Sequence, residues 1–294
     1  MKTQLQEHVI QYQEQLPLSQ KTSFRIGGAA ELVLFPSSIK QLQACVKLCA
    51  QEGIKPFILG NGSNLLVKDS GLDGVVISTE KLQKMEMLGD HFITCEAGVM
   101  LNRLCAFAQK HNLTGHEFAY GIPGMVGGSV FMNAGAYGGE MKDIVHAVQY
   151  IDPAGELHEL GAEELYMGYR SSVFMQNGGI VASVTVKLTP GDASQIKAQM
   201  NEIMQRRRDK QPLELPSAGS VFKRPPGHFA GTLIEQCGLK GRSVGGAQVS
   251  EKHAGFIVNT GGAKAADVRA LIALVQAVVE QETGVLLEPE IQFV

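Results

Sequence analysis

A serine in the segment LPSAGSVFKRP, residues 215–225, is the first side chain that could do chemistry. Ser220 follows Gly219 and has no histidine beside it. Phe222 stands where the nucleophile motif G-x-S-x-G requires its second glycine, so a hydrolase nucleophile is disfavoured. The residues alone leave three roles open for Ser220: a turn residue, a phosphate contact or a proton donor.

A glycine-rich segment, LGNGSNLLV at 59–67, follows an apolar run and could bring consecutive backbone N–H groups onto an anion. It is not the dinucleotide fingerprint G-x-G-x-x-G, because Leu65 stands at the third glycine and a strand-like run follows. A phosphate nest and a plain β-turn are both compatible with it. The residues of interest are Gly60, Asn61, Gly62, Ser63 and Asn64.

A second glycine-rich segment, YGIPGMVGGSVFMNAGAYGGE at 120–140, offers backbone donors over a long stretch with little side-chain bulk. Such backbone suits a large flat cofactor, and two separate glycine-rich segments suit the pyrophosphate and the ring system of one dinucleotide. A mobile surface loop is the alternative. The residues of interest are Gly121, Pro123, Gly124, Gly127, Gly128, Ser129, Asn133, Ala134, Gly135, Ala136 and Tyr137.

Apolar periodicity predicts the elements that position these segments. Helices are expected over 38–53, with Ser38 and Gln41 as a capping box, and over 100–112, 192–212 and 264–283. Strands are expected at 30–35, 55–60, 64–67, 74–78, 91–98, 180–191, 254–259 and 286–294. The mixture lacks regular βαβ alternation, which favours the α+β class.

The composition narrows the function classes. The chain has 294 residues, a net charge of -3 and a hydrophobic content of 44%. These values give no reason to expect nucleic acid or a membrane as partner. The start of the chain is polar and lacks the apolar core of a signal peptide, so we expect a cytoplasmic protein. Five cysteines without paired spacing predict neither a metal site nor disulfides.

Motifs along nearly the whole chain resemble the UDP-N-acetylenolpyruvoylglucosamine reductase (MurB) family of bacterial cell-wall synthesis, in that family's order. Besides the two glycine-rich segments they are KTSFRIGG at 21–28, YRSSVF at 169–174, PSAGSVFKRPPGHFAGTLIEQCGLKG at 216–241, VSEKHAGFIVN at 249–259 and LEPEI at 287–291. The short interval from Arg170 to Ser220 is similar to the compact type of the family, which lacks an inserted tyrosine loop.

The resemblance implies a two-lobed FAD-binding fold of the vanillyl-alcohol-oxidase type and a C-terminal α+β substrate-binding domain. The expected bounds are 1–84 and 85–191 for the lobes and 192–294 for the substrate domain, whose last strand returns to the first lobe. FAD is expected to bind noncovalently, and NADPH is expected to donate hydride. NADPH and a UDP-sugar would take turns in one cleft of a monomer.

The resemblance also assigns roles in the reduction of an enolpyruvyl ether. Arg170 and Glu290 would stabilise the enolate, and Ser220 would protonate it, because a carbanion-like enolate is basic enough to accept a hydroxyl proton. From the residues alone, a strand-end salt bridge is the favoured reading of Arg170, and a surface carboxylate is the favoured reading of Glu290.

The residues expected on the substrate side are Tyr169, Lys210 and Lys223. The basic run at 206–210 is by default a solvated helix end, although its position resembles the family's contact for nucleotide phosphates, with Lys210 favoured. Arg224 departs from the longer type of the family, which has Asn there. His253 is expected to be structural or to support a residue of the site. Two rivals stay open: another FAD-dependent oxidoreductase of the same fold, and a catalytically silent flavin-binding sensor.

Overall fold

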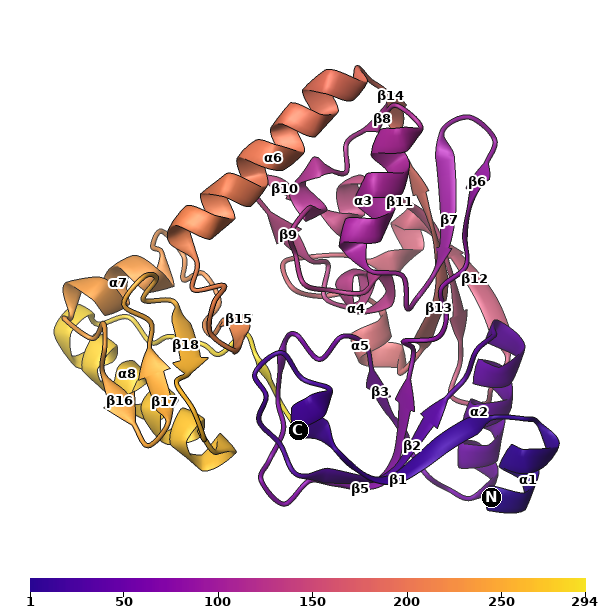
Figure 1. Cartoon of the computed structure of the whole chain (residues 1–294), viewed down its shortest axis with the longest axis horizontal. Coiled ribbons are helices and arrows are strands. Elements are labelled where there is room, and N and C mark those ends of the chain that lie inside the picture. The colour runs from indigo at the N-terminus through magenta and orange to yellow at the C-terminus, as the bar shows by residue number, and fades with distance from the viewer. The chain divides into compact units, whose positions relative to one another are not determined.

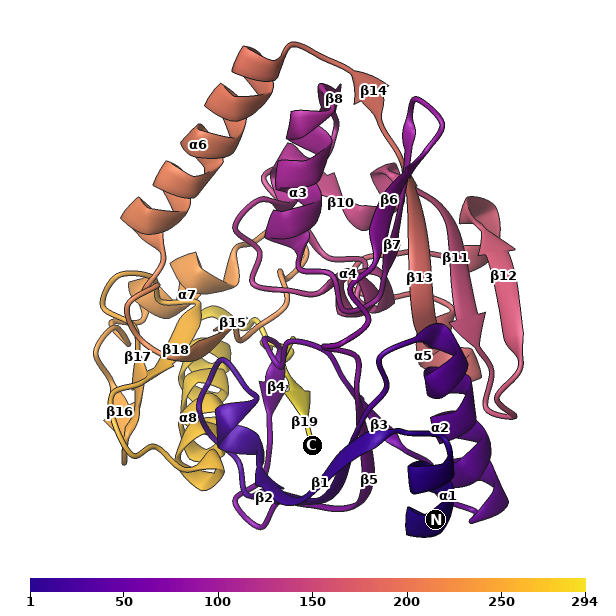
Figure 2. The ribbon, with the colours of Figure 1, turned by 45° about the vertical axis from the view of Figure 1, so that its right-hand side comes forward.

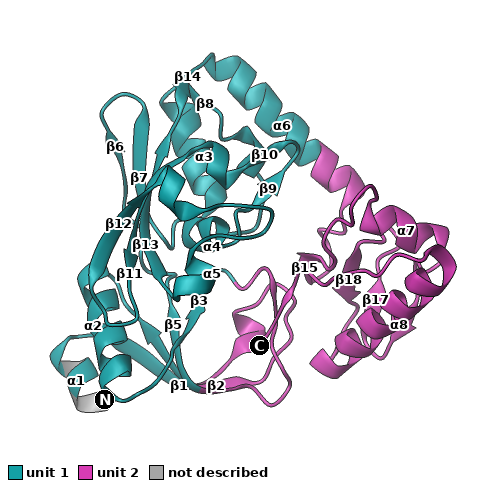
Figure 3. Cartoon of the chain, turned by 180° about the vertical axis from the view of Figure 1, so that it is seen from behind, with its two compact units in different colours: residues 1–14, 32–61, 74–205 teal, residues 15–31, 62–73, 206–294 magenta. Residues whose placement is uncertain are grey.

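The computed structural model describes residues 1, 4–5 and 7–294. The chain divides into two compact units, shown in Figure 3. Unit 1 comprises residues 1–14, 32–61 and 74–205, and unit 2 comprises residues 15–31, 62–73 and 206–294. Both units are therefore discontinuous in sequence, and each has hydrophobic cores of its own.

In one core of unit 1, α2 (Ile39–Gln51) packs beside a four-stranded sheet. The first helix of the chain, α1 (Lys2–Glu7), precedes these elements. The sheet order is β1 (Gln11–Pro17), β2 (Ala29–Phe35), β5 (Leu72–Ser78) and β3 (Phe57–Leu59), with β3 parallel to β5. Ser38 caps α2 as expected by accepting from the Gln41 N–H at 3.2 Å. The expected reciprocal contact is wrong by one residue, because the Gln41 side chain accepts from Ser37 N–H at 2.8 Å.

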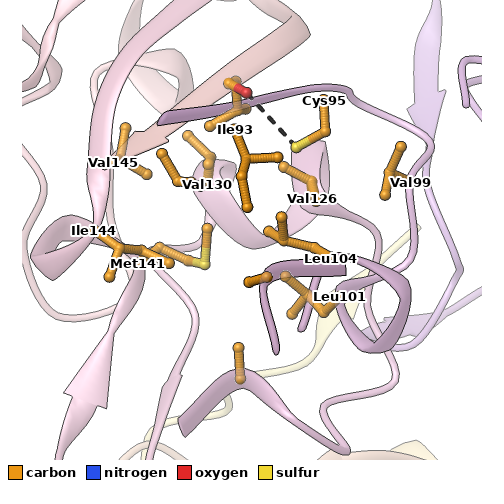
Figure 4. Close-up of a cluster of buried hydrophobic side chains, with 14 of the residues drawn as sticks. Ile93, Cys95, Val99, Leu101, Leu104, Val126, Val130, Met141, Ile144 and Val145 are labelled. Carbon is orange, nitrogen blue, oxygen red and sulfur yellow. Dashed lines mark hydrogen bonds between the residues drawn. The ribbon is translucent and has the colours of Figure 1, made fainter. Parts of the chain in front are cut away.

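The second core of unit 1 lies on a five-stranded antiparallel sheet (Figures 1 and 2). Its order is β12 (Leu157–Gly161), β11 (Val145–Ile151), β13 (Ile180–Lys187), β7 (Phe92–Glu96) and β6 (Met85–Leu88). Helices α3 (Leu101–Lys110) and α4 (Val126–Phe131) bury apolar side chains against it. Figure 4 shows Val126, Leu104 and Ile93 in this core, where the Cys95 thiol donates to the Val184 carbonyl at 3.6 Å.

Short elements complete unit 1. They are β8 (Leu113–Thr114), β9 (Gly135–Ala136), β10 (Gly139–Glu140), β14 (Thr189–Pro190), α5 (Phe174–Asn177) and the 3-10 helices η2 (Glu117–Ala119), η3 (Met141–Asp143) and η4 (Ala162–Leu165). Strands β9 and β10 form an antiparallel hairpin within the second glycine-rich segment. Helix α6 (Ala193–Lys210) begins in unit 1 and ends in unit 2.

Unit 2 packs α7 (Ala230–Gln236) and α8 (Ala265–Thr283) with a four-stranded sheet. The sheet order is β15 (Ser217–Ser220), β18 (Phe256–Asn259), β17 (Ala247–Val249) and β16 (Ser243–Val244). The 3-10 helix η1 (Leu18–Gln20) and β4 (Leu65–Leu66) come from the earlier segments of this unit. The last strand, β19 (Gln292–Phe293), pairs in parallel with β4.

The start of α8 is capped from a distant part of the sequence. Asp69 accepts hydrogen bonds from the backbone N–H groups of Ala265 at 2.9 Å and Ala266 at 3.2 Å. These N–H groups lie in the first turn, where a helix has no internal acceptors and favours negative charge. Asp69 thereby joins the segment 62–73 to the C-terminal part of unit 2.

The long periodic elements expected from the sequence are present, with ends within a few residues of expectation: α2, α3, α6, α8 and β13. The expected strand over 286–294 is too long, since only Gln292–Phe293 forms a ladder. Strands β11 and β12 were not expected. No helix in the described part of the chain is long and apolar enough to cross a bilayer.

Candidate active site

The first glycine-rich segment contributes to both units. Gly60 and Asn61 belong to unit 1, where the Asn61 amide donates to the Pro123 carbonyl at 2.7 Å. This bond ties the first glycine-rich segment to the second. A Cβ atom on Gly60 would have no neighbour within 4 Å, so the backbone of Gly60 is open to a ligand.

Gly62, Ser63 and Asn64 belong to unit 2. Gly62 has φ +61°, and a Cβ there would lie 2.2 Å from the Lys21 carbonyl oxygen, so close packing and backbone conformation both require glycine. The Asn64 amide donates to the Glu290 carbonyl at 3.3 Å. Gly62 and Asn64 therefore have demonstrable roles in holding unit 2 together.

Two adjacent glycines of the second segment lie in different surroundings. A Cβ on Gly127 would lie 2.7 Å from the Ala97 Cβ, and the Gly127 N–H donates to the Ala97 carbonyl at 2.9 Å. Gly128 is exposed, and a Cβ there would meet nothing within 4 Å. Gly127 lets α4 pack closely against Ala97, whereas the backbone of Gly128 is exposed and has no side chain over it.

Other members of this segment also serve the protein itself. The buried Ser129 hydroxyl donates to the Met125 carbonyl at 2.8 Å, and the Gly121 N–H donates to Asn102 Oδ1 at 2.6 Å. A Cβ on Gly124 would lie 2.9 Å from Ser129 Oγ. A Cβ on Gly135 would lie 2.7 Å from both the Gly139 carbonyl oxygen and Glu140 Cβ.

The tip of the β9–β10 hairpin is exposed. Tyr137 has φ +52° and Gly138 has φ +90°, the left-handed pair of a tight two-residue turn. Tyr137 is 41% exposed, and Ala134 and Ala136 on either side of Gly135 are half-buried. A planar aromatic ring on a small-residue hairpin offers a surface for a ring system.

These residues fit a dinucleotide such as FAD. Open glycine backbone occurs in both segments, at Gly60 and Gly128, and the Asn61 bond to Pro123 links the segments within unit 1. Backbone N–H groups without side-chain bulk suit phosphate oxygens. Among the described residues, no three His, Cys, Asp or Glu side chains form a metal-binding group.

Arg170 lies on a tight turn of unit 1. Gly168 and Ser171 exchange backbone hydrogen bonds of 3.1 and 3.2 Å, so Tyr169 and Arg170 form the tip. Arg170 has φ +53°, an unfavourable backbone conformation for a residue with a Cβ. Its guanidinium donates to the Gly135 carbonyl at 3.4 Å and lies 5.1 Å from the centre of the Tyr169 ring, which is 53% exposed as a residue.

Ser220 lies in unit 2 at the end of β15, after an irregularity in its pairing with β18. Its hydroxyl donates to the Phe222 carbonyl at 3.2 Å, and the residue is half-buried. The preceding Gly219 has φ +78°, and a Cβ there would meet nothing within 4 Å. Gly219 therefore presents open backbone beside Ser220 within unit 2.

Glu290 is brought to the Ser220 segment by backbone hydrogen bonds. The Glu290 N–H donates to the Val221 carbonyl at 2.7 Å, and the Lys223 N–H donates to the Glu288 carbonyl at 2.8 Å. The structure thus brings together the segments of Ser220 and Glu290, which the sequence separates widely. Arg170 belongs to unit 1.

His253 lies beside the Ser220 segment. Both its imidazole and Ser220 Oγ border Gly255, and His253 Nδ1 accepts from the Gly255 N–H at 3.1 Å. Burial is the main cause that lowers the pKa of His253, with Lys240 and Lys210 acting in the same direction. The imidazole is therefore favoured in its neutral form, with its proton on Nε2.

The basic side chains differ in their surroundings. Lys223 Nζ pairs with Glu288 Oε1 at 2.5 Å, and the Arg224 guanidinium lies 4.1 Å from the centre of the Phe229 ring. Lys210 is exposed at the end of α6. The default expectation of a fully solvated run at 206–210 is wrong for Arg207, which is 6% exposed and donates to Gln211 Oε1 at 3.2 Å.

Comparison with known proteins identifies the family. Residues 211–294 match the profile of the UDP-N-acetylenolpyruvoylglucosamine reductase C-terminal domain, and residues 30–161 match the FAD binding domain. A UDP-N-acetylenolpyruvoylglucosamine reductase of Clostridium perfringens is 48% identical over 95% of this chain and 91% of its own. The chain belongs to the UDP-N-acetylenolpyruvoylglucosamine reductase family.

A relative of the same name from Caldanaerobacter subterraneus subsp. tengcongensis is also 48% identical, over 95% of this chain and 92% of its own. The crystal structure of UDP-N-acetylenolpyruvylglucosamine reductase (MurB) from Thermus caldophilus matches with a TM-score of 0.83 and 36% identity, over 97% of this chain and 98% of that one. The expected family and the expected α+β fold with an FAD-binding part are thereby confirmed.

Sequence reasoning missed several residues whose hydrogen bonds hold unit 1 or unit 2 together. Asp69, Glu140 and Gly168 act through bonds to backbone or to other polar groups, and none lies in a pattern that names its partner. The left-handed conformation of Arg170 was not expected either. The FAD and substrate contacts predicted for individual residues stay predictions.

Proposed function

We propose that the chain reduces UDP-N-acetylglucosamine enolpyruvate to UDP-N-acetylmuramate for peptidoglycan synthesis, with FAD as cofactor and NADPH as electron donor. The observation that carries the proposal is the backbone bond from Glu290 to Val221, which holds residue 290 beside the segment of Ser220. It lies in the part of the chain that matches the C-terminal domain of this reductase family.

Bound FAD would supply redox chemistry, with two electrons from NADPH passing as hydride to the terminal vinyl carbon of the substrate. We assign its binding to the two glycine-rich segments, with the open backbone of Gly60 and Gly128 approached most closely. Gly127 and Ser129 support that surface through their contacts within unit 1. Gly62 and Asn64 hold the part of the first segment that belongs to unit 2.

Hydride addition to the vinyl carbon leaves negative charge over the neighbouring carbon and the carboxylate. Arg170 can stabilise this enolate, because its guanidinium is always charged and matches a carboxylate in shape. Glu290 contributes a carboxyl group from a segment of unit 2. Preorganised groups of this kind typically lower such barriers by about 3 to 4 kcal/mol each.

Ser220 then supplies the proton. Its hydroxyl donates to the Phe222 carbonyl, and rotation about its Cβ–Oγ bond redirects the proton without moving the backbone. The enolate carbon gains this proton and the serine oxygen is reprotonated from water. No histidine is required at the hydroxyl, because the acceptor is a carbanion and the serine acts as an acid.

Tyr169 and Lys223 are proposed to contact the substrate, and Lys210 the nucleotide phosphates, at a cleft that NADPH and the UDP-sugar use in turn. We further propose that the protein is a cytoplasmic monomer. Its FAD-binding lobes would be residues 1–84 and 85–191, and its substrate-binding domain would be residues 192–294. Light scattering during gel filtration tests the oligomeric state, since a dimer mass at micromolar concentration contradicts it.

The function is tested on the purified full chain by its spectrum and its two half-reactions. The expected protein is yellow with FAD, NADPH bleaches it in the absence of air, and UDP-N-acetylglucosamine enolpyruvate restores the colour with formation of UDP-N-acetylmuramate. A protein that cannot be reconstituted with FAD overturns the proposal. Bleaching by a sugar or hydroxy acid, without reoxidation by the enolpyruvyl substrate, would instead favour an oxidase of the same fold.

A further inference from the structure

Asn133 is a fully buried polar side chain of the second glycine-rich segment. It is 0% exposed, and its φ of +42° lies in the left-handed region that asparagine tolerates. Its amide nitrogen donates to the Gly168 carbonyl and to Glu140 Oε2, both at 2.9 Å. Its amide oxygen accepts from the Lys142 N–H at 2.9 Å. The side chain therefore has strong partners inside unit 1.

The bond to Gly168 fixes the turn that carries Arg170. Gly168 is the first residue of that turn and exchanges backbone hydrogen bonds with Ser171. Arg170 lies between them in a left-handed conformation, which is maintained only where surrounding contacts determine it. Asn133 supplies one such contact at the base of the turn.

The other two bonds of Asn133 fix the β9–β10 hairpin. Glu140, in β10, accepts from Asn133 through Oε2 and pairs with the Lys142 ammonium through Oε1. The hairpin includes Gly135, whose carbonyl accepts from the Arg170 guanidinium. The buried amide of Asn133 thus connects the turn that carries Arg170 to the hairpin that the Arg170 guanidinium contacts.

We propose that Asn133 is a positioning residue that sets the place and direction of the Arg170 guanidinium. This inference rests on the proposed function of Arg170 and assigns to Asn133 a role distinct from direct contact with FAD. Its chemistry is specific, since Gly168 and Glu140 both present acceptors and the side chain must place two N–H donors at one end. Aspartate has the same shape but presents acceptors there.

The test is Asn133→Asp, studied as the FAD-reconstituted full chain. We expect the substrate-dependent reoxidation of reduced flavin to slow by about 10- to 100-fold, because small misplacement of a catalytic group has effects of this size. Bleaching by NADPH should change less than about 3-fold, and the FAD content should stay near one per chain. The dissociation constant for UDP-N-acetylmuramate, measured by calorimetry on the oxidised protein, should rise with the same substitution.

Asn112→Asp is the matched control. Asn112 is also left-handed, with φ +56°, but is exposed at the end of α3, so its substitution should leave both half-reactions unchanged. If Asn133→Asp slows both half-reactions equally, or loses FAD, Asn133 acts on the flavin site and the inference is wrong.

The Arg170→Ala variant separates this inference from the proposed function. Arg170→Ala should itself slow reoxidation by about 100-fold or more. If it does not, the proposed role of Arg170 fails. If it does, Asn133→Asp should cause less than about a 3-fold further loss in the Arg170→Ala background, because both changes act on one interaction. Fully multiplicative losses would show that Asn133 acts independently of Arg170.

The double variant Asn133→Asp with Glu140→Gln separates the effect of the bond to Gly168 from that of the bond to Glu140. The amide introduced by Glu140→Gln could donate to the carboxylate introduced by Asn133→Asp, which restores the hairpin bond with its direction reversed. The carbonyl of Gly168 would still face a carboxylate. We expect the melting temperature of the FAD-free protein to recover relative to Asn133→Asp while reoxidation stays slow. Full recovery of reoxidation would show that the Gly168 bond is dispensable and would overturn the inference.

Discussion

The two units hold the side chains proposed for catalysis by different means. In unit 1, the turn that carries Arg170 is closed by backbone bonds between Gly168 and Ser171, but a side chain, Asn133, also holds its base and ties it to the β9–β10 hairpin. In unit 2, the segments of Ser220 and Glu290 are joined by backbone bonds between residues 221–223 and 288–290. Backbone bonds survive most substitutions, because every residue except proline carries the same groups. Unit 1 should therefore be the more sensitive of the two to changes in supporting side chains.

The largest expected effect is on the rate of flavin reoxidation when the hydroxyl of Ser220 is removed and the backbone bonds of unit 2 are kept. Ser220→Ala should slow reoxidation of reduced flavin by the enolpyruvyl substrate by about 100- to 10,000-fold, because it removes the proton donor. FAD content and bleaching by NADPH should stay unchanged, since the backbone bonds at Val221 persist. Stopped-flow absorbance measures both half-reactions.

Ser217→Ala, in the same strand β15, is the control for a lost hydroxyl. It should reoxidise at nearly the wild-type rate. Reoxidation of Ser220→Ala at the wild-type rate would refute the assigned role of Ser220.

Two neighbouring glycines of unit 1 can separate protein support from cofactor contact. Gly127→Ala should lower the free energy of unfolding by about 1 to 3 kcal/mol, because the new methyl group would crowd Ala97. Gly128→Ala should leave stability unchanged or raise it by up to about 1 kcal/mol, because alanine favours helix. If FAD approaches Gly128, its affinity should nevertheless fall by about 10-fold or more.

Denaturation of the FAD-free proteins and FAD titration by fluorescence measure the two quantities. Equal FAD affinity in Gly128→Ala and the wild type would remove Gly128 from the cofactor surface.

A buried histidine of unit 1 predicts a dependence of stability on pH. His116 is fully buried, and its Nε2 bonds to the Leu113 carbonyl at 3.0 Å. Burial lowers the pKa of His116 from its ordinary 6.5, against the opposing effect of the Glu117 carboxylate. The unfolded chain then binds a proton that the folded chain resists, so stability is retained above pH 6.5 and falls as the pH drops below it. The loss is at most about 1.4 kcal/mol per pH unit.

His116→Gln keeps an N–H donor but cannot be charged. Its unfolding free energy, from urea denaturation at about pH 7.5 and about pH 5.5, should fall less at the lower pH than that of the wild type. His228→Gln, at an exposed position of unit 2, controls for the loss of an imidazole. The same pH dependence in His116→Gln and the wild type would contradict the prediction.

The smallest expected effect tests the robustness of unit 2. Glu288→Gln removes the ion pair with Lys223 but keeps the backbone bond that the Glu288 carbonyl accepts. The Glu288 side chain is 70% exposed, so the loss of unfolding free energy should be below about 1 kcal/mol. A larger loss in thermal or urea denaturation would show that side chains support this segment as they do in unit 1.

The sequence predicts the elements that bury one face along a regular period. Helices α2, α3 and α8 have apolar side chains at helical spacing, and all three were expected close to their observed ends. Strand β12 has no buried residue and therefore no alternation that a strand prediction can use. The sequence of β11 gives an equally weak strand signal, because its seven residues show no clear alternation of buried and exposed positions.

The candidate site was predictable as motifs but not as contacts. The motif containing Asn133 suggests a ligand-binding loop, whereas the structure shows its amide occupied by Gly168, Glu140 and Lys142. The bond between Glu290 and Val221 uses backbone atoms alone, which no residue pattern specifies. Family resemblance supplied the proposed roles of Arg170, Ser220 and Glu290, and physical patterns alone left each of them with an ordinary structural alternative.

The capping of α8 by Asp69 affects how the protein can fold while the ribosome is still synthesising it. Asp69 and the helix that it caps are separated by 196 residues, and β4 finds its partner only in β19, at Gln292–Phe293. Contacts of such sequence separation form slowly, and these cannot form until both partners have been synthesised. The nascent chain must therefore carry Asp69 and β4 without these partners, and a stop codon before residue 292 would remove the strand that pairs with β4.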